Sequence, residues 1–354
     1  MSKNKIAEDA VALLKALIEV QSFSREEELA AKVVRSFWTK LDIPMETKGH
    51  NTWIRNKYWQ EDKPVILLNS HIDTVKPNKG YTRDPFSADV VDGKLYGLGS
   101  NDAGGCLVSL MATFRYFYDR KDLPFNLIMA ATAEEEVSGI NGVESILDEL
   151  GNVDLVIVGE PTLMQMAIAE KGLLVIDATA HGEAGHAARD EGVNALYKAM
   201  EDIQKLKNFS FSKESGVLGK TKATVTQVEA GYQHNVVPDK CHFVIDVRTN
   251  EHYSNRQAFE VIDELLESEC KERSFRLNSS GIPLEHSLVK KGIELGLSYY
   301  GSPTTSDQAV IPYTSIKIGP GDSARSHTSD EYIFLNEIPE GIDIYCKLLE
   351  DLKI

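Results

Sequence analysis

The chain has 354 residues, 42% of them hydrophobic and 26% charged, and carries a formal net charge of −16. A chain longer than the ~250 to 300 residues of one large core is expected to form two domains. The negative charge and the absence of any basic run exclude a protein that binds the phosphate backbone of nucleic acid. No apolar stretch approaches the ~20 residues that span a bilayer, and residues 1–10 lack a signal-peptide core, so the sequence predicts a cytoplasmic protein without membrane contacts.

Two amphipathic helices are predicted at the beginning of the chain. The first covers residues 6–20, and its apolar face consists of Ile6, Ala10, Leu13, Leu14, Leu17 and Ile18. In the second helix, over residues 24–38, Ser24 and Glu27 have the spacing of an N-terminal capping box. The stripe expected to be buried in this helix consists of Leu29, Val33 and Phe37.

Three near-continuous apolar segments follow at residues 65–73, 125–133 and 153–161, and a helical stretch at residues 104–119 separates the first two. Strands that are buried on both faces and alternate with helices indicate an α/β fold. We therefore predict a mostly parallel sheet with helices on both faces. In such a fold a ligand binds at the carboxyl ends of the strands.

The pattern changes after residue 170. Strands are predicted over residues 173–182, 222–231, 240–249 and 274–280, and helices over residues 192–206 and 255–271. This βαββαβ order is that of a ferredoxin-like α+β domain. We predict that residues 171–282 form an inserted domain, and that residues 1–170 and 283–354 form the α/β domain.

Histidine and acidic residues stand where the predicted strands end. His71 and Asp73 are two residues apart after the first strand, so their side chains share a face and can form a hydrogen bond. Further candidates are Asp102, Glu134, Glu135, Glu136, Glu160 and His327. Each alone has an ordinary explanation, such as a helix cap or a solvated turn. Carboxylates that converge in one crevice, however, repel one another, and a cation removes that repulsion.

The residue types indicate which cation and which chemistry. Two histidines with three or four carboxylates suit two divalent ions, and imidazole ligation favours Zn²⁺ over the alternatives Co²⁺ and Mn²⁺. The chain has no H-E-x-x-H, no nucleophile elbow and no Walker lysine. In "GLGSND" the third glycine of a dinucleotide fingerprint is replaced by Asp102. The sequence therefore predicts metal-assisted hydrolysis.

Ordered motifs along nearly the whole chain resemble one known family. These motifs are "SHIDTV", "YGLGSNDAGG", "ATAEEEVSG", "VGEP", "GHAA", "HNVVPDK" and "SHTSDEY". They are similar to the co-catalytic di-zinc deacylase and exopeptidase family of acetylornithine deacetylase, succinyl-diaminopimelate desuccinylase, aminoacylase and carboxypeptidase G. "VGEPT" and "GPGD" make the resemblance greatest to acetylornithine deacetylase and the related acetyl-lysine deacetylases.

The resemblance implies a set of metal ligands. Asp102 would bridge two divalent metal ions. One ion would also be held by His71 and Glu160. The other ion would also be held by Glu136 and His327.

Two residues act beside the metals in this resemblance. Asp73 would hold the tautomer of the ligating histidine, and Glu135 would be the general base. The family usually shows Asp-Glu-Glu where this chain has Glu134 to Glu136, so a second register stays open, with Glu134 as base and Glu135 as ligand. The preceding "ATA" favours the first register.

For the inserted domain the resemblance implies a lid that also forms a homodimer. His186 would reach across the dimer interface to stabilise the oxyanion. Asn235 and Arg248 would hold the carbonyl and the α-carboxylate of the substrate. Without the resemblance, these residues read as a surface histidine, a turn asparagine and a solvated arginine.

The resemblance implies hydrolysis of a small N-acyl amino acid, with N-acetylornithine in arginine biosynthesis as the first candidate. Alternatives on the same scaffold are an N-succinyl amino acid desuccinylase, an N-acetyl-citrulline or N-acetyl-lysine deacylase, and a dipeptidase or aminopeptidase. A catalytically silent binding protein is disfavoured, because every ligand position and the base position are filled.

Overall fold

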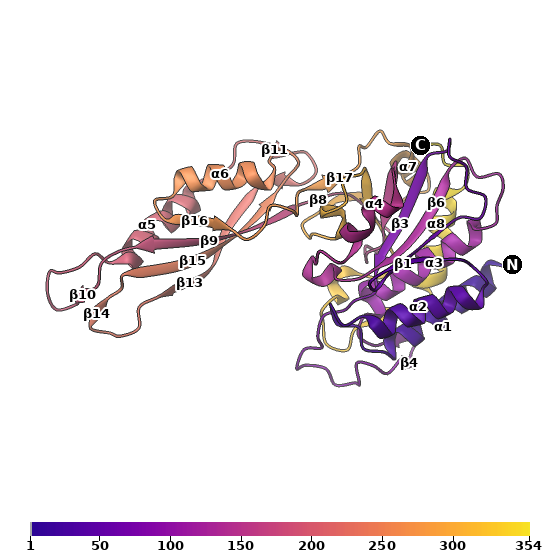
Figure 1. Ribbon diagram of the computed structural model, residues 1–354, viewed down its shortest axis with the longest axis horizontal. Helices are drawn as coiled ribbons and strands as arrows, with labels where there is room; N and C mark the ends of the chain where they lie inside the picture. Colours follow the sequence, from indigo (N-terminus) through magenta and orange to yellow (C-terminus); the bar gives the residue numbers. More distant parts are fainter. Residues whose placement is uncertain (1) are drawn as a thin grey trace. The chain divides into compact units, whose positions relative to one another are not determined.

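The computed structural model describes residues 2–354, which form two compact units (Figure 1). The first unit contains the chain up to Ile168 with residues 281–300 and 306–354, and the second contains residues 169–280 and 301–305. The insertion predicted at residues 171–282 is shifted from the second unit by two residues at each end and lacks residues 301–305. Within residues 2–354 no helix is both long enough and apolar enough to cross a membrane.

A nine-stranded sheet forms the centre of the first unit. Its order is β1-β2-β6-β3-β7-β19-β8-β17, with β18 paired to β8. The central strands β6, β3, β7 and β19 are mutually parallel, as the sequence predicts. The strand bounds are β1 (Glu46–Lys48), β2 (Asn51–Arg55), β3 (Val65–His71), β6 (Asn126–Thr132), β7 (Leu155–Val158), β8 (Met166–Glu170), β17 (Ser280–Gly281), β18 (Tyr299–Ser302) and β19 (Ser315–Lys317). Three short strands form a separate sheet, namely β4 (Val90–Val91), β5 (Lys94–Tyr96) and β20 (Tyr332–Phe334).

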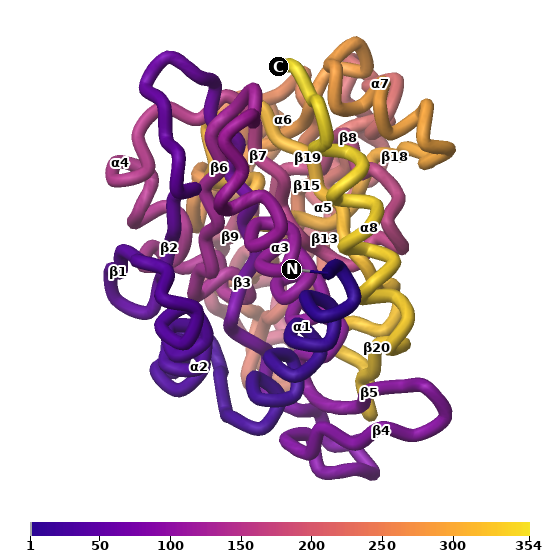
Figure 2. The backbone as a smooth tube through the Cα atoms, turned by 90° about the vertical axis from the view of Figure 1, so that its right-hand side faces the viewer, coloured from indigo at the N-terminus to yellow at the C-terminus, as the bar shows by residue number. Residues whose placement is uncertain are grey.

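Helices cover both faces of the nine-stranded sheet. They are α1 (Lys3–Ile18), α2 (Glu28–Lys40), α3 (Cys106–Phe117), α4 (Leu147–Leu150), α7 (Ser287–Glu294) and α8 (Glu337–Leu349). On one face α1, α3 and α8 pack against one another (Figure 2). Side chains alternate along β3, so Ile66 and Leu68 join the core under these helices, whereas Leu67 joins a second core with residues of α4.

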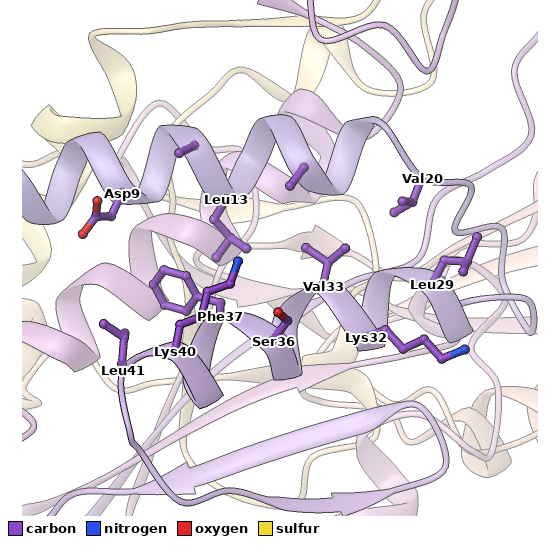
Figure 3. A pocket seen from close by; sticks show the side chains of 12 residues that line it. Asp9, Leu13, Val20, Leu29, Lys32, Val33, Ser36, Phe37, Lys40 and Leu41 are labelled. Atoms are coloured by element: carbon purple, nitrogen blue, oxygen red, sulfur yellow. The ribbon is translucent and has the colours of Figure 1, made fainter.

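The second predicted helix differs from the structure in its start and its buried face. α2 begins at Glu28, and its buried residues are Ala30, Ala31, Val34 and Trp38. The predicted stripe was therefore wrong at Leu29, which is 50% exposed, whereas Val33 and Phe37 are partly buried and pack against the core. Leu29 lines, with Val33 and Phe37, a surface groove of about 610 Å³ between α1 and α2 (Figure 3). Two apolar faces compete in this helix, and the face with the larger Trp38 side chain is buried.

The second unit is a four-stranded antiparallel sheet with two helices on one face (Figure 1), which confirms the ferredoxin-like prediction. The strand order is β13-β15-β9-β16. The element bounds are β9 (Gly172–His181), α5 (Ala195–Asn208), β13 (Lys222–Ala230), β15 (Lys240–Thr249), α6 (Asn255–Leu265) and β16 (Glu269–Glu272). Two short ribbons accompany the sheet, β10 (Gly185–His186) with β14 (Val236–Val237), and β11 (Glu214–Ser215) with β12 (Gly219–Lys220).

The end of the predicted helix 255–271 and the strand predicted at 274–280 were wrong. α6 ends at Leu265, and β16 is at residues 269–272. The cause lies in α5, where the Asp202 carboxylate accepts hydrogen bonds from the backbone N–H groups of Glu267 and Ser268. These bonds satisfy N–H groups that would donate within the helix if α6 were longer. The helix therefore ends, and the chain continues as strand β16.

Candidate metal centre

His71 is the last residue of β3, a strand that is buried over its whole length. Its Nδ1 lies 2.9 Å from the backbone carbonyl oxygen of Asp73 and 3.5 Å from Oδ1 of the same residue. The carbonyl contact requires the proton on Nδ1. The other ring nitrogen, Nε2, is buried and forms no hydrogen bond within residues 2–354. A buried ring nitrogen without a hydrogen bond therefore faces the crevice at the strand end.

Carboxylates from three separate segments surround this nitrogen. Oδ1 of Asp102 is 3.4 Å from Nε2 of His71, and Oε1 of Glu160 is 3.8 Å from it. Oε2 of Glu135 lies at 3.9 Å. The parallel strands β3, β6 and β7 end at one edge of the sheet, and for that reason residues distant in sequence meet here.

His327 approaches the same carboxylate cluster from the C-terminal part of the chain. Its Nε2 is 3.0 Å from Oε2 of Glu136 and 3.6 Å from Oδ2 of Asp102. Asp102 thus directs one oxygen toward His71 and the other toward His327. This is the arrangement needed from a carboxylate that bridges two cations.

A buried glutamate holds the backbone that carries Asp102. This residue lies in η1 (Ser100–Gly105), a π-helical turn in front of α3. Oε1 of Glu331, a residue only 1% exposed, accepts hydrogen bonds from the N–H groups of Asn101 at 2.8 Å and Asp102 at 2.9 Å. The turn is therefore fixed by a carboxylate that does not belong to the cluster.

The three consecutive acidic residues after β6 have different surroundings. The carboxylate of Glu134 accepts hydrogen bonds from N and Nδ2 of Asn141 at 3.4 and 3.0 Å. Glu135 and Glu136, at the start of η2 (Glu135–Val137), place their carboxylates in the cluster. Their N–H groups donate to Oδ1 and Oδ2 of Asp73 at 3.0 and 3.1 Å. The carboxylate of Asp73 thus lies closer to the loop of the acids than to the imidazole, which Asp73 contacts through its backbone carbonyl.

The proximity of several buried acids changes the pKa values of the residues in the cluster. Burial raises the pKa of Glu135 well above its ordinary value, and the charge of Glu160 adds to the shift. Burial and the charge of Asp102 raise the pKa of Glu160 to about 8. Burial opposes protonation of His71, but its contacts with Asp102 and Asp73 outweigh this and raise its pKa well above the usual range. The hydrogen bond to Glu136 raises the pKa of His327 to about 9.

These observations fit divalent cations. Two sets of three residues each bring their ligand atoms within 4.8 Å of one another. The first set is His71, Asp102 and Glu136, and the second is His71, Glu135 and Glu160. Two imidazoles and several carboxylates are the donors that borderline divalent metals prefer. A cation would also supply the partner that Nε2 of His71 lacks and would offset the repulsion among the acids. Glu135, the predicted base, belongs to the second set.

Three buried acids near the cluster were absent from the sequence prediction of the site: Glu27, Asp307 and Glu331. Asp307 accepts hydrogen bonds from Nδ2 of Asn69 at 2.7 Å and Oγ1 of Thr132 at 3.2 Å, and so lies behind the ends of β3 and β6. Glu331 stands inside the motif "SHTSDEY", yet nothing in its spacing shows that it accepts bonds from a distant turn. A pattern of residue types does not reveal backbone donors.

The residues predicted for substrate binding lie in the second unit. His186 and Asn235 are exposed neighbours at the β10–β14 ribbon, where N–H of Ala187 donates to the carbonyl of Asn235 at 3.0 Å. Arg248 is near the opposite end of β15 from this ribbon, because Lys240 pairs with His181 and Arg248 with Leu173. Eight residues of strand correspond to roughly 26 Å. The guanidinium of Arg248 binds Asp246 through two hydrogen bonds of 2.9 and 3.1 Å.

Comparison with known proteins places the chain among enzymes. Residues 67–351 match the model of peptidase family M20/M25/M40. The chain is 25% identical to succinyl-diaminopimelate desuccinylase of Wolbachia pipientis, over 97% of this chain and 93% of that one. An uncharacterized metallohydrolase of Methanocaldococcus jannaschii is 26% identical, over 97% and 98%.

Solved structures share the fold. Aminopeptidase PepT of Bacillus cereus has a TM-score of 0.76 at 19% identity, over 99% of this chain and 98% of that one. The YXEP protein of Bacillus subtilis, described as a dinuclear metal-binding peptidase, has a TM-score of 0.76 at 16% identity, over 98% of both chains. At these identities the likeness supports the fold alone.

Proposed function

The chain belongs to peptidase family M20/M25/M40 and is a metallohydrolase of amide bonds, and from this premise we propose that it removes the acyl group from an N-acyl amino acid. The observation that carries the proposal is the buried, unpartnered Nε2 of His71, with carboxylates from three other segments within 4 Å. A buried cluster of carboxylates around an imidazole is characteristic of sites that bind cations or transfer protons.

The centre binds two divalent metal ions, and we propose how its residues divide between them. His71, Glu160 and Asp102 would hold the first ion, and Glu136, His327 and Asp102 would hold the second. Imidazole ligation makes Zn²⁺ the first candidate and Co²⁺ the second. When bound, the ions polarise the amide carbonyl and lower the pKa of the attacking water toward ~7.

Glu135 is the proposed general base. Its carboxylate accepts the proton of the attacking water and then delivers that proton to the leaving nitrogen. Burial and the charge of Glu160 raise the pKa of this carboxylate, which favours its uptake of a proton. The surroundings of Glu134, whose carboxylate is bound by Asn141, support the register with Glu135 as base and Glu136 as ligand.

The second unit is the proposed lid and dimerisation domain. His186 is proposed to stabilise the oxyanion and Arg248 to bind the α-carboxylate, with Asn235 on the substrate carbonyl. His186 and Arg248 lie near opposite ends of the strand β15, roughly 26 Å apart at ~3.3 Å per residue. A small substrate that contacts both residues therefore needs them from two copies of the chain, which favours a homodimer.

The acyl group distinguishes two candidate substrates. N-acetylornithine is the first, as the motifs "VGEPT" and "GPGD" indicate, and the reaction would then serve arginine biosynthesis. N-succinyl-diaminopimelate is the second, and it is favoured by the desuccinylase relatives, which would place the reaction in lysine biosynthesis. The loops that follow Glu136 and Glu160 expose Val137, Ile140 and Leu163, and apolar side chains near the cluster would suit the uncharged acetyl group.

A substrate panel tests this proposal. Protein loaded with Zn²⁺ is assayed with N-acetyl and N-succinyl derivatives of ornithine, citrulline and lysine, with N-succinyl-diaminopimelate, and with two dipeptides. A strong preference for one acyl amino acid supports deacylation and names the acyl group. Cleavage of the dipeptides alone assigns the chain to the peptidases instead. The variant Glu135→Gln, loaded with metal in the same way, controls for contaminating hydrolases.

A further inference from the structure

Glu27 is a fully buried acid outside the proposed metal cluster. The sequence assigned it to a helix cap, but its side chain makes no such bond. Oε1 instead accepts hydrogen bonds from the N–H of Arg25 at 2.6 Å and from the N–H of Glu134 at 3.2 Å. Oε2 lies 2.6 Å from Nδ1 of His50 in the turn between β1 and β2. One carboxylate therefore joins three parts of the chain.

The contact with Glu134 concerns the residue directly before the proposed base. Glu134 has a φ of 58°, which is the left-handed conformation that residues other than glycine rarely adopt. The backbone reverses at this point, so that the carboxylate of Glu134 turns to Asn141 while the next two carboxylates enter the cluster. The acceptor that satisfies its N–H helps to keep this conformation populated.

The segment before α2 holds the same loop at a second point. Oγ of Ser24 donates to Oδ2 of Asp73 at 2.7 Å, and Asp73 in turn accepts the N–H groups of Glu135 and Glu136. The N–H groups of three consecutive residues, 134 to 136, are thus all bound by carboxylates that lie outside the ligand set. Glu27 is the one of these two carboxylates for which the mechanism assigns no role.

We propose that Glu27 is a positioning residue for catalysis, which acts through the backbone of Glu134 to aim the carboxylate of Glu135. The inference rests on the proposed function of Glu135 as base. A misplacement of a reacting group by about 1 Å can cost 10²-fold in rate, so a backbone contact next to the base has a direct route to kcat. The ligand set and the substrate contacts do not include Glu27, so metal content and KM are expected to stay unchanged.

Two variants distinguish the length of the Glu27 side chain from its charge. Glu27→Gln keeps the length and the acceptor oxygen, whereas Glu27→Asp keeps the charge but withdraws the acceptor by one methylene. We expect Glu27→Asp to lower kcat by about 10-fold to 100-fold and Glu27→Gln to stay within about threefold of wild type. Amide hydrogen exchange at residues 133–137 is expected to accelerate in Glu27→Asp and not in Glu27→Gln.

A matched control is available in the second unit. Asp202 is 2% exposed and, like Glu27, accepts two backbone N–H groups, in this case those of Glu267 and Ser268 just after α6. Asp202→Glu therefore disturbs a buried carboxylate of the same kind, and is expected to lower the Tm while kcat stays within about twofold. Equal losses of kcat in Glu27→Asp and Asp202→Glu, at a temperature where both are folded, would refute a specific role.

The two proposals fail separately. Hydrogen exchange requires neither substrate nor metal, so unchanged exchange at residues 133–137 in Glu27→Asp overturns the role of Glu27 whatever the enzyme hydrolyses. Equal kcat values for Glu27→Asp and Glu27→Gln overturn it as well. A wild-type protein that hydrolyses no member of the substrate panel, but in which exchange responds as expected, overturns the proposed function and leaves the contact of Glu27 with the loop standing.

Discussion

The two units of the molecule hold their candidate functional residues in opposite ways. In the first unit His71, Asp102 and Glu160 are largely buried and meet within 4 Å, and the pKa values of His71 and Glu160 are strongly raised. In the second unit His186 and Asn235 are exposed, and Arg248 is already paired with Asp246. The fold of the first unit brings its set of residues into contact. The residues of the second unit are exposed and need a substrate or a second chain as their partner.

This difference shows what each unit contributes to a reaction. Burying several like charges together costs free energy unless a cation binds among them. The cluster in the first unit therefore indicates a cation site from the residues of that unit alone. Exposed residues on an antiparallel sheet carry no such signature. The roles proposed for these exposed residues come from the family resemblance. They also require contacts with a substrate that lie outside the second unit. The predictions below test the two units separately, from the largest effect to the smallest.

The largest effect is expected in the first unit, from Glu135→Gln. Removal of a general base costs about 10²-fold to 10⁴-fold, and we expect a loss near the upper end because the same residue also returns the proton. Metal content, measured by elemental analysis of the dialysed protein, should equal that of wild type. Glu134→Gln is the matched control and should remain within about tenfold. A greater loss in Glu134→Gln would assign the base to the other register.

In the second unit, His186→Ala should lower kcat by about 10²-fold to 10³-fold, as expected for an oxyanion donor. The stronger test is complementation. If His186 acts across a dimer interface, hybrids of His186→Ala with Glu135→Gln contain one complete site, and random mixing should restore about a quarter of wild-type activity. Additive residual activity without restoration would show that each chain uses its own histidine.

A smaller effect, on binding, is expected from Arg248→Met. Loss of a charge-assisted pair with the substrate carboxylate should raise KM about 10-fold to 100-fold with little change in kcat. Arg273→Met is the control, since Arg273 forms a comparable bidentate pair with Asp177 in the same unit. Equal changes in KM for the two variants would mean that Arg248 stabilises the sheet and does not bind substrate.

The metal affinity of the first unit should depend on pH. The hydrogen bond to Glu136 raises the pKa of His327 to about 9, and burial with the charge of Asp102 raises that of Glu160 to about 8. At pH 7 these ligands hold protons in the metal-free protein, and the protons must leave when ions bind. Affinity should therefore rise between pH 6 and 8, about tenfold per unit for each proton released. Calorimetry in buffers of different ionisation enthalpy measures that number, and no proton release would contradict the assignment.

The sequence predicted the parts of the site that follow from sheet topology. His71, Glu135 and Glu160 stand at or just after the ends of the buried parallel strands β3, β6 and β7, and parallel strands bring their ends together, whereas Asp102 comes from the turn η1. The sequence was wrong where two local patterns compete. The spacing of Ser24 and Glu27 fits a capping box, yet both side chains bind the loops of the candidate site. The end of α6 depends on Asp202, 63 residues before Leu265, and no local pattern contains that contact.

The central claim is that the strand-end cluster holds two catalytic ions bridged by Asp102. The most direct measurement counts the tightly bound divalent ions per chain and follows hydrolysis on the same samples, before chelation, after chelation and after metal is returned. The account predicts two ions, loss of activity when they are removed, recovery when they return, and loss of both ions in Asp102→Ala. Activity that persists without bound metal, or two bound ions in Asp102→Ala, would contradict it.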